Sequence, residues 1–168
     1  MRLGADFFAR DVLDVAPDLV GKILVRTLPD GSERRLRITE TEAYRGEEDT
    51  ACHACHGRTG RTEVLYHAPG TVYVYLCYGM HWMLNIVTGR VDQPQAVLIR
   101  ACEGCEGPGR LTKALSVTGE LNDRDISATG GLRIEDDETK VNIILDKRVG
   151  INYAAQEDIE RLWRFKKG

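Results

Sequence analysis

The stretch from Thr71 to Asn85, TVYVYLCYGMHWMLN, constrains the fold most, because it predicts two paired strands joined by a tight turn. β-Branched and aromatic residues fill both halves, and Gly79 between them can adopt the positive φ that a short hairpin turn requires. The turn would project the ring of Tyr78 and the thioether of Met80 from a rigid support. A ring on such a projection is well shaped to enter a gap between stacked bases.

Alternation along the first strand separates two sets of side chains, Val72, Val74 and Leu76 on one face and Tyr73, Tyr75 and Cys77 on the other. We expect the first set to face the hydrophobic core. The second set could join the core or line a binding surface. Tyr78 differs, because the apex of a turn is difficult to bury in a monomer. Asn85 ends the return strand, where a buried amide needs hydrogen-bond partners and could contact the edge of a base.

The length of 168 residues predicts one domain over residues 1–168, and the apolar fraction of 42% is ordinary for a folded protein. No run of about 18 apolar residues is present, so we expect no membrane span. The N-terminal segment MRLGADFFARD lacks the apolar core of a signal peptide. We therefore expect an intracellular protein, in the cytoplasm of a prokaryote or the nucleus of a eukaryote, with five cysteines as thiols or metal ligands.

The net charge of −3 argues mildly against nucleic-acid binding, but the charges are unevenly distributed. Residues 50–113 carry 6 basic and 4 acidic groups, a net charge of 6 − 4 = +2, and contain all four histidines. A locally basic face on an acidic protein could still contact phosphates, with binding that weakens steeply as salt increases.

The rest of the chain predicts an α+β fold, with a curved, mainly antiparallel sheet flanked by short helices and a protruding β-hairpin. Pro17 is expected in the first turn of a helix near residues 18–20. The helices expected further on cover residues 110–117 and 156–165, the second followed by a short extended piece. Strands are expected at residues 22–28, 33–44, 71–77, 82–88, 96–102 and 141–145, with a turn at residues 29–32.

Three further segments carry side chains with chemical potential. Glu40, Glu42 and Tyr44 would share one face of a strand. A carboxylate next to a ring can handle a proton while the ring stacks on a planar substrate, although exposed glutamates on a strand are also ordinary. Arg58 and Arg61 lie in a Thr- and Gly-containing segment that could contact phosphates or could be a solvated loop.

The segment Cys52-His53-Ala54-Cys55-His56 contains four residues that can bind zinc, and Cys102 with Cys105 could supply a second ligand pair. The spacing is not one of the common tetrahedral signatures. The alternative is that the thiols are buried as small hydrophobic groups and the histidines form hydrogen bonds.

Taken together, these segments resemble the alkyladenine (3-methyladenine) DNA glycosylase family over most of the chain. Each segment is short and weak alone, but the ordered set is specific. The matching segments are residues 40–44, 46–49, His53, 58–61, 69–75, Tyr78, Gly79, Met80, Asn85, 97–101 and 107–115, and residues 149–151 and 162–165 also fit.

The resemblance implies a DNA repair enzyme that flips an alkylated or deaminated purine out of duplex DNA and hydrolyses its N-glycosidic bond. Glu42 would be the general base that activates water, and Arg100 would help to hold that water. Tyr44, His53 and Tyr75 would line the pocket for the flipped base. The remaining pocket residue, Asn85, would exclude guanine by crowding its exocyclic amino group.

The resemblance also assigns the contacts with double-stranded DNA. Tyr78 would fill the gap that the flipped base leaves, with Met80 beside it. The phosphate backbone would be contacted by basic side chains, namely Arg58, Arg61, Arg110 and Lys113. No segment offers a nucleophilic lysine, so we expect a monofunctional enzyme that leaves an abasic site. A monomer without cofactor or metal would suffice.

Two departures from the family pattern stand out. Gly60 occupies a position where proline is frequent, so the arginine loop would be more mobile. Cys52 and Cys55 are unusual beside His53, and zinc bound to His53 would disrupt the base pocket. A non-catalytic nucleic-acid-binding module and a small zinc protein therefore stay as alternatives. The lesion itself is open among 3-methyladenine, 7-methylguanine, hypoxanthine and etheno-adenine.

Overall fold

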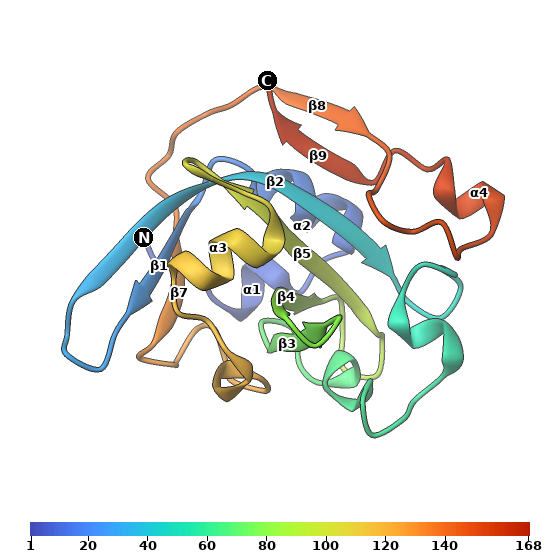
Figure 1. Ribbon diagram of the computed structural model, residues 1–168, viewed down its shortest axis with the longest axis horizontal. Helices are drawn as coiled ribbons and strands as arrows, with labels where there is room; N and C mark the ends of the chain where they lie inside the picture. Colours follow the sequence, from blue (N-terminus) through green and yellow to red (C-terminus); the bar gives the residue numbers. More distant parts are fainter.

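A nine-stranded antiparallel sheet dominates the computed structural model, which describes residues 1–168 (Figure 1). Its main path runs β3–β4–β5–β2–β1–β7, while β6 pairs with β5, and β9 pairs with both β2 and β8. The strands are β1 (Ile23–Thr27), β2 (Glu33–Arg45), β3 (Val72–Cys77), β4 (His81–Thr88), β5 (Gln95–Cys102), β6 (Cys105–Glu106), β7 (Leu132–Glu135), β8 (Ile143–Asp146) and β9 (Arg164–Lys167). The predicted α+β class and antiparallel sheet are confirmed.

The helices are short and connect or cover the strands. α2 packs on β2 and β5, while α3 packs on β4 and β5. The α-helices are α1 (Ala5–Phe8), α2 (Val12–Leu19), α3 (Pro108–Ala114) and α4 (Gln156–Ile159), and the 3₁₀ turns are η1 (His53–His56), η2 (Glu63–Tyr66) and η3 (Gly119–Leu121). None of them has the length and hydrophobicity that a transmembrane span requires.

The sheet has two differently covered faces. On one face, alternate side chains of the strands pack with the helices in a core cluster of 25 buried residues, which includes Ala43, Val97 and Ile99. The opposite face carries Glu42 and its neighbours in register. Part of it is covered by a second cluster of 8 buried residues, in which the η1 and η2 region packs against Tyr73, Val87 and Ala96 of the sheet. The first face therefore stabilises the fold, and the second face has room for a site.

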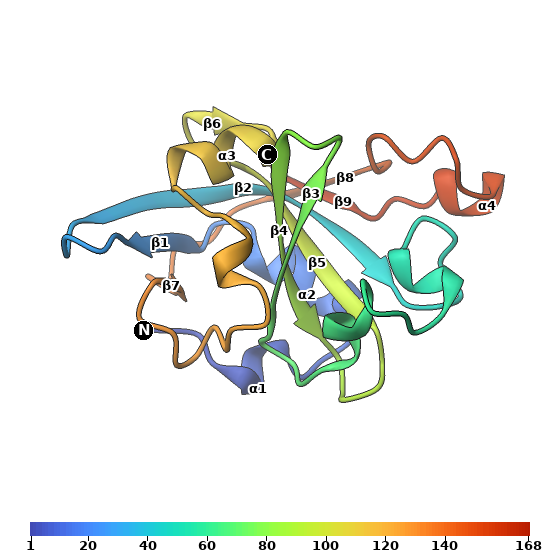
Figure 2. The same cartoon turned by 60° about the horizontal axis from the view of Figure 1, so that its bottom comes forward.

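The predicted hairpin is confirmed as β3 and β4, which pair from Val72–Ile86 to Cys77–His81. Figure 2 shows it projecting from the body of the protein. Tyr78 and Gly79 both have positive φ, 53° and 66°, which closes the tight turn. The expectation of a core face is confirmed for the two valines but not for Leu76, which is 41% exposed near the tip of the hairpin.

Two expectations about helices are wrong. Pro17 lies inside α2 near its C-terminal end, whereas Asp11 begins the helix by accepting a hydrogen bond from the backbone of Leu13. The region expected to be helical from 156 to 165 forms only the short α4. The segment beyond it turns into β9 because pairing with β2 and β8 outweighs the local helix preference.

Candidate active site

Register across four strands brings the central site residues together. Tyr73 on β3 pairs with Asn85 on β4, which pairs with Leu98 on β5, which in turn pairs with Glu42 on β2. Residues directly opposite one another in a sheet point to the same face. The four side chains therefore form one row on the face away from the helices, with Tyr44 two residues beyond Glu42 on the same side.

The carboxylate of Glu42 is fully buried, and both of its oxygens accept hydrogen bonds. The hydroxyl of Tyr44 donates to Oε1 at 2.9 Å, and the backbone N–H of Val149 donates to Oε2 at 2.8 Å. Burial raises the pKa of Glu42, and the charge of Arg100 together with these two donors opposes that rise. The site thus holds a proton acceptor of increased basicity in a fixed orientation.

Arg100 lies between two carboxylates. Its Nε is 3.7 Å from Oε2 of Glu42 and 3.8 Å from Oε2 of Glu40, and Glu40 is also 3.3 Å from Nη1 of Arg164 on β9. The pairing of β2 with β5 shifts register on both sides of Glu40. The guanidinium is therefore near Glu42 without forming a direct hydrogen bond to it.

The site opens into a cleft of about 450 Å³ that reaches from Glu42 and Arg100 to the hairpin tip at Tyr78. A smaller apolar pocket of about 40 Å³ includes Asn85 and Tyr73. Four aromatic side chains line both spaces, so the pocket continues the cleft: Tyr44, His53, Tyr75 and Tyr153. The predicted catalytic and base-pocket residues therefore all lie in one continuous space.

The aromatic side chains in this space hold one another in place by direct contacts. Nδ1 of His53 lies 3.0 Å from the hydroxyl of Tyr73, and its ring meets that of Tyr75 edge to face with centroids 4.5 Å apart. Burial, assisted by the charge of Arg61, lowers the pKa of His53 to about 4, so the imidazole is neutral at pH 7. A neutral aromatic wall suits a planar ligand, including a cationic one.

Asn85 is buried, and its amide nitrogen donates to the backbone carbonyls of Tyr73 and Met83 at 3.2 and 3.4 Å. These bonds fix the orientation of the amide against the strand pair. A rigid polar group at the wall of a small pocket can reject a ligand by its shape.

The hairpin tip exposes apolar groups beside the cleft. Tyr78 is 90% exposed and Met80 73% exposed. A non-glycine residue in the left-handed region costs roughly 1–2 kcal/mol. The ring of Tyr78 is thus held away from the protein by a strained turn.

The predicted DNA-backbone cations differ in their surroundings. Arg58 forms salt bridges with Glu63 and Asp92, at 2.7 and 2.9 Å, so its charge is already compensated. Arg61 lines the cleft with its guanidinium carbon 5.9 Å from the centroid of the Tyr75 ring. Arg110 and Lys113 are exposed on α3 and pair with no carboxylate.

The Cys and His residues do not assemble into a group of three or more that could hold a metal ion. Cys52 is buried with its thiol 3.9 Å from the carbonyl oxygen of Pro94, and Cys55 lies 3.7 Å from that of Thr50. Cys102 on β5 and Cys105 on β6 lie opposite each other in the register of the two strands. His53 instead contacts the aromatic rings of the cleft.

Sequence reasoning did not assign three contributors to the site. Val149 acts through its backbone N–H, which no side-chain pattern signals. Tyr153 lines both spaces, and its hydroxyl donates to the carbonyl oxygen of Ala51 at 2.8 Å. Arg148 is buried and pairs with Asp49 at 2.6 Å. Residues 149–151 fit the family pattern, but that match assigned them no role.

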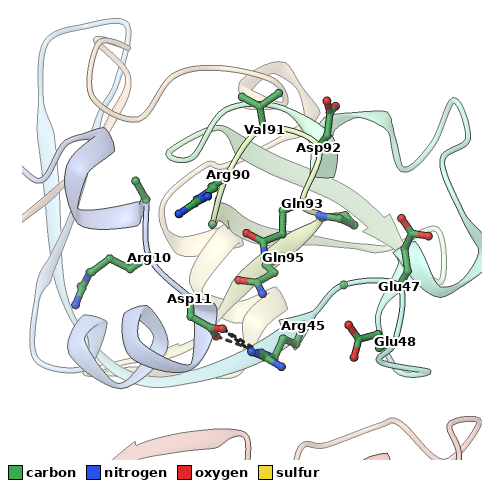
Figure 3. Close-up of a pocket in the computed structure, with 14 residues that line it drawn as sticks. Arg10, Asp11, Arg45, Glu47, Glu48, Arg90, Val91, Asp92, Gln93 and Gln95 are labelled. Atoms are coloured by element: carbon green, nitrogen blue, oxygen red, sulfur yellow. Dashed lines mark hydrogen bonds and ion pairs between the residues drawn. The ribbon is translucent and has the colours of Figure 1, made fainter.

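A larger depression than the cleft, of about 780 Å³, lies elsewhere on the protein (Figure 3). It shares no lining residue with the cleft, and it is bounded by the segments around Arg10, Arg45 and Arg90. Figure 3 shows Arg45 and Asp11 pairing across it, at 2.6 Å. Because it is open, and Arg10 and Arg45 pair with carboxylates, we place the candidate active site in the cleft at Glu42.

The chain matches a known family over nearly its whole length. The sequence model of Methylpurine-DNA glycosylase (MPG) matches residues 6–106 and 103–167. A relative from Methanocella arvoryzae is 46% identical over 97% of this chain and 90% of its own length. Relatives from Natranaerobius thermophilus and Borreliella afzelii are each 43% identical, over 98% and 95% of this chain and 94% and 92% of their own lengths. All three carry the name "Putative 3-methyladenine DNA glycosylase".

Proposed function

Because the chain belongs to the methylpurine-DNA glycosylase family, it is a DNA repair enzyme of the 3-methyladenine DNA glycosylase type, and we propose that Glu42 is its general base. The observation that carries this proposal is the buried carboxylate of Glu42 in an aromatic cleft that extends to the exposed ring of Tyr78. The substrate is a purine in duplex DNA that carries an alkyl group or has lost its amino group.

The damaged base must leave the helix before it can reach Glu42. A stacked purine encloses its N-glycosidic bond, so we infer that the nucleotide rotates outward, at a cost of a few kcal/mol. Tyr78 projects beside the opening of the cleft, and its ring would occupy the space that the base leaves. A lesion that pairs weakly costs less to extrude, which contributes to selectivity.

For an alkylated purine, the chemistry needs only one carboxylate. An alkylated purine is cationic and leaves without strong protonation, unlike the sugars that glycoside hydrolases cleave with two carboxylates. Glu42 would remove a proton from water as the water attacks C1′ of the sugar. Arg100 is close enough to orient that water and keep Glu42 ionised.

The pocket would select the base by stacking and by shape. Tyr44, His53 and Tyr75 offer ring faces to a planar cation, and such contacts contribute about 0.5–2 kcal/mol each. Asn85 would exclude guanine because its fixed amide crowds the position of the exocyclic amino group.

The product would be an abasic site in an uncut strand. No lysine lines the cleft or the inner pocket, so no amine is placed to form a Schiff base with the sugar. One flipped base occupies one cleft, and a monomer would be sufficient for the reaction.

An excision assay on duplexes that contain 3-methyladenine, 7-methylguanine, hypoxanthine or etheno-adenine tests this function. Glu42→Gln should lower the single-turnover rate by about 100- to 10,000-fold and leave affinity for an abasic-site mimic within a few-fold. Glu40→Gln is the matched control, because Glu40 is near Arg100 but bonds neither Tyr44 nor Val149. Excision by Glu42→Gln at the wild-type rate would exclude Glu42 as the base. Strand cleavage without added alkali would exclude the monofunctional reaction.

A further inference from the structure

Arg148 and Asp49 form a buried ion pair directly behind the candidate active site. Their side chains are 0% and 1% exposed, and Nη1 and Nη2 of Arg148 reach the two carboxylate oxygens at 2.6 and 3.0 Å. Burial would lower the pKa of Arg148, but the bonds to Asp49 outweigh this and raise it. The guanidinium is therefore charged in the interior, where it faces the carboxyl group of Asp49.

The same guanidinium ties together three separate parts of the chain. It donates to the backbone carbonyls of Ala43 on β2 and Asp158 in α4, at 2.9 and 3.2 Å. Its central carbon lies 5.0 Å from the ring centroid of Tyr44 and 4.9 Å from that of Trp163. The loop between β8 and α4, seen in Figure 1, is thus attached to the strand that carries Glu42.

Both hydrogen-bond donors to Glu42 depend on this attachment. Val149, which donates to Oε2, directly follows Arg148 in the chain. Tyr44, which donates to Oε1, has its ring against the guanidinium. Movement of Arg148 would therefore displace both donors at once, although Arg148 itself does not bond Glu42.

Stability alone is a poor explanation for such a pair. Taking two charges out of water costs several kcal/mol each, and apolar residues of similar volume often serve equally well. Nε of Arg148 is also buried without a hydrogen-bond partner. A pair that costs this much to bury, and that holds both donors, suggests a role in the site.

We propose that Arg148 and Asp49 are positioning residues that hold Tyr44 and the Val149 N–H against the carboxylate of Glu42. The inference rests on the proposed role of Glu42 as the general base. It predicts that a loosened pair lowers the rate of base excision and weakens the preference of Glu42 for its ionised form.

Other charged groups near Glu42 set the background for this effect. Arg100 on β5 is the strongest stabiliser of the carboxylate, while Tyr44 and Glu40 lie on β2, Tyr75 on β3 and Arg164 on β9. None of these side chains is itself substituted when Arg148 is changed to lysine, which keeps the positive charge. A shift in the acidic limb of the pH–rate profile would therefore report the displacement of the two donors.

The test compares Arg148→Lys with Arg37→Lys in single-turnover excision at saturating enzyme. Arg37 is the matched control, because it makes a bidentate pair with Asp137, bonds the Gly21 carbonyl and lies outside the cleft. We expect Arg148→Lys to reduce the maximal rate about 10- to 100-fold, move the acidic limb to higher pH and leave affinity for abasic-site DNA unchanged. Arg37→Lys should keep the wild-type maximal rate and the wild-type position of the acidic limb.

Trp163→Leu provides a second variant in case Arg148→Lys fails to fold, since it keeps both charges and removes one ring that packs on the guanidinium. It should show the same shift with a smaller loss of rate. A folded Arg148→Lys or Trp163→Leu enzyme with a wild-type acidic limb would overturn the inference. Wild-type enzyme and Glu42→Gln are measured alongside. If Glu42→Gln loses excision but Arg148→Lys keeps the wild-type rate and acidic limb, only the positioning role is rejected. A wild-type enzyme without excision would reject the proposed function as well.

Discussion

The hydroxyl of Tyr44 donates a hydrogen bond of 2.9 Å to the carboxylate of Glu42, two residues away on the same strand. Tyr44 also lines both the cleft and the inner pocket. The side chain that would contact the flipped base is therefore the one that orients the proposed general base. The Tyr44 side chain would therefore serve both the binding of the base and the orientation of Glu42.

Tyr44→Phe separates these two roles, because it keeps the ring and removes the donor. Loss of a hydrogen bond to the ionised carboxylate should raise the pKa of Glu42 further. We expect the acidic limb of the excision rate to move to higher pH, so that the variant is most impaired at the acidic end of the range. Rates measured across pH 5–9 check this, and an unshifted limb would contradict it.

Glu42→Gln should stabilise the fold at neutral pH. Burial raises the folded-state pKa of Glu42 above its ordinary value of 4.5, so ionisation of this group opposes folding. Stability that the protonated group provides is present below pH 4.5 and is lost as pH rises through the folded-state pKa. Urea unfolding should show Glu42→Gln more stable than wild type at pH 7, with the difference shrinking toward pH 4. A constant difference would refute this.

His53 should make the fold sensitive to acid. Its pKa falls from 6.5 to about 4, chiefly through burial, so its stabilising contribution is lost as pH decreases between these values. The contribution is at most about 3 kcal/mol. His53→Gln should flatten unfolding free energy against pH in this window. His67→Gln is the control of opposite sign, because Asp123 raises the pKa of His67.

Tyr78→Ala should weaken binding to damaged duplex DNA without affecting the fold. Stacking of a base on an aromatic ring contributes roughly 1–3 kcal/mol, which is about 5- to 150-fold in affinity. Met80→Ala should have a smaller effect, because a thioether stacks less well. Fluorescence anisotropy with an abasic-site duplex measures both. Unchanged affinity and excision in Tyr78→Ala would mean that the ring does not fill the gap.

The salt dependence of DNA binding should distinguish the four proposed backbone cations. Removing one phosphate contact reduces the slope of log K against log salt by about 0.9. We expect this change for single glutamine variants of Arg61, Arg110 and Lys113. Arg58→Gln should change the slope less, because Glu63 and Asp92 already compensate its charge. An equal reduction of the slope in all four variants would show that Arg58 leaves its carboxylate partners when DNA binds.

Local patterns in the sequence predicted the part of the site that depends on strand periodicity. Glu42 and Tyr44 share a face because side chains alternate along a strand, and the hairpin follows from its β-branched and aromatic residues and Gly79. Neither prediction required knowledge of distant contacts, so both could be made from short segments.

The remaining contributors depend on contacts between distant segments. Asp49 and Arg148 are 99 positions apart, and a backbone N–H such as that of Val149 has no residue-specific signature. The segment at residues 156–165 looked helical locally. Its last part became β9 because a vacant edge of β2 was available for pairing, which no local propensity reveals.

The pairing of β9 with β2 has a consequence for synthesis of the protein. Phe165 pairs with Thr41, and the carbonyl of Trp163 accepts the backbone N–H of Ala43, so the strand that carries Glu42 is completed by residues at least 120 positions later. A nascent chain released from the ribosome before residue 163 would lack this edge and the ring against Arg148. Such a fragment could present an exposed Tyr78 to DNA but would lack a correctly assembled general base.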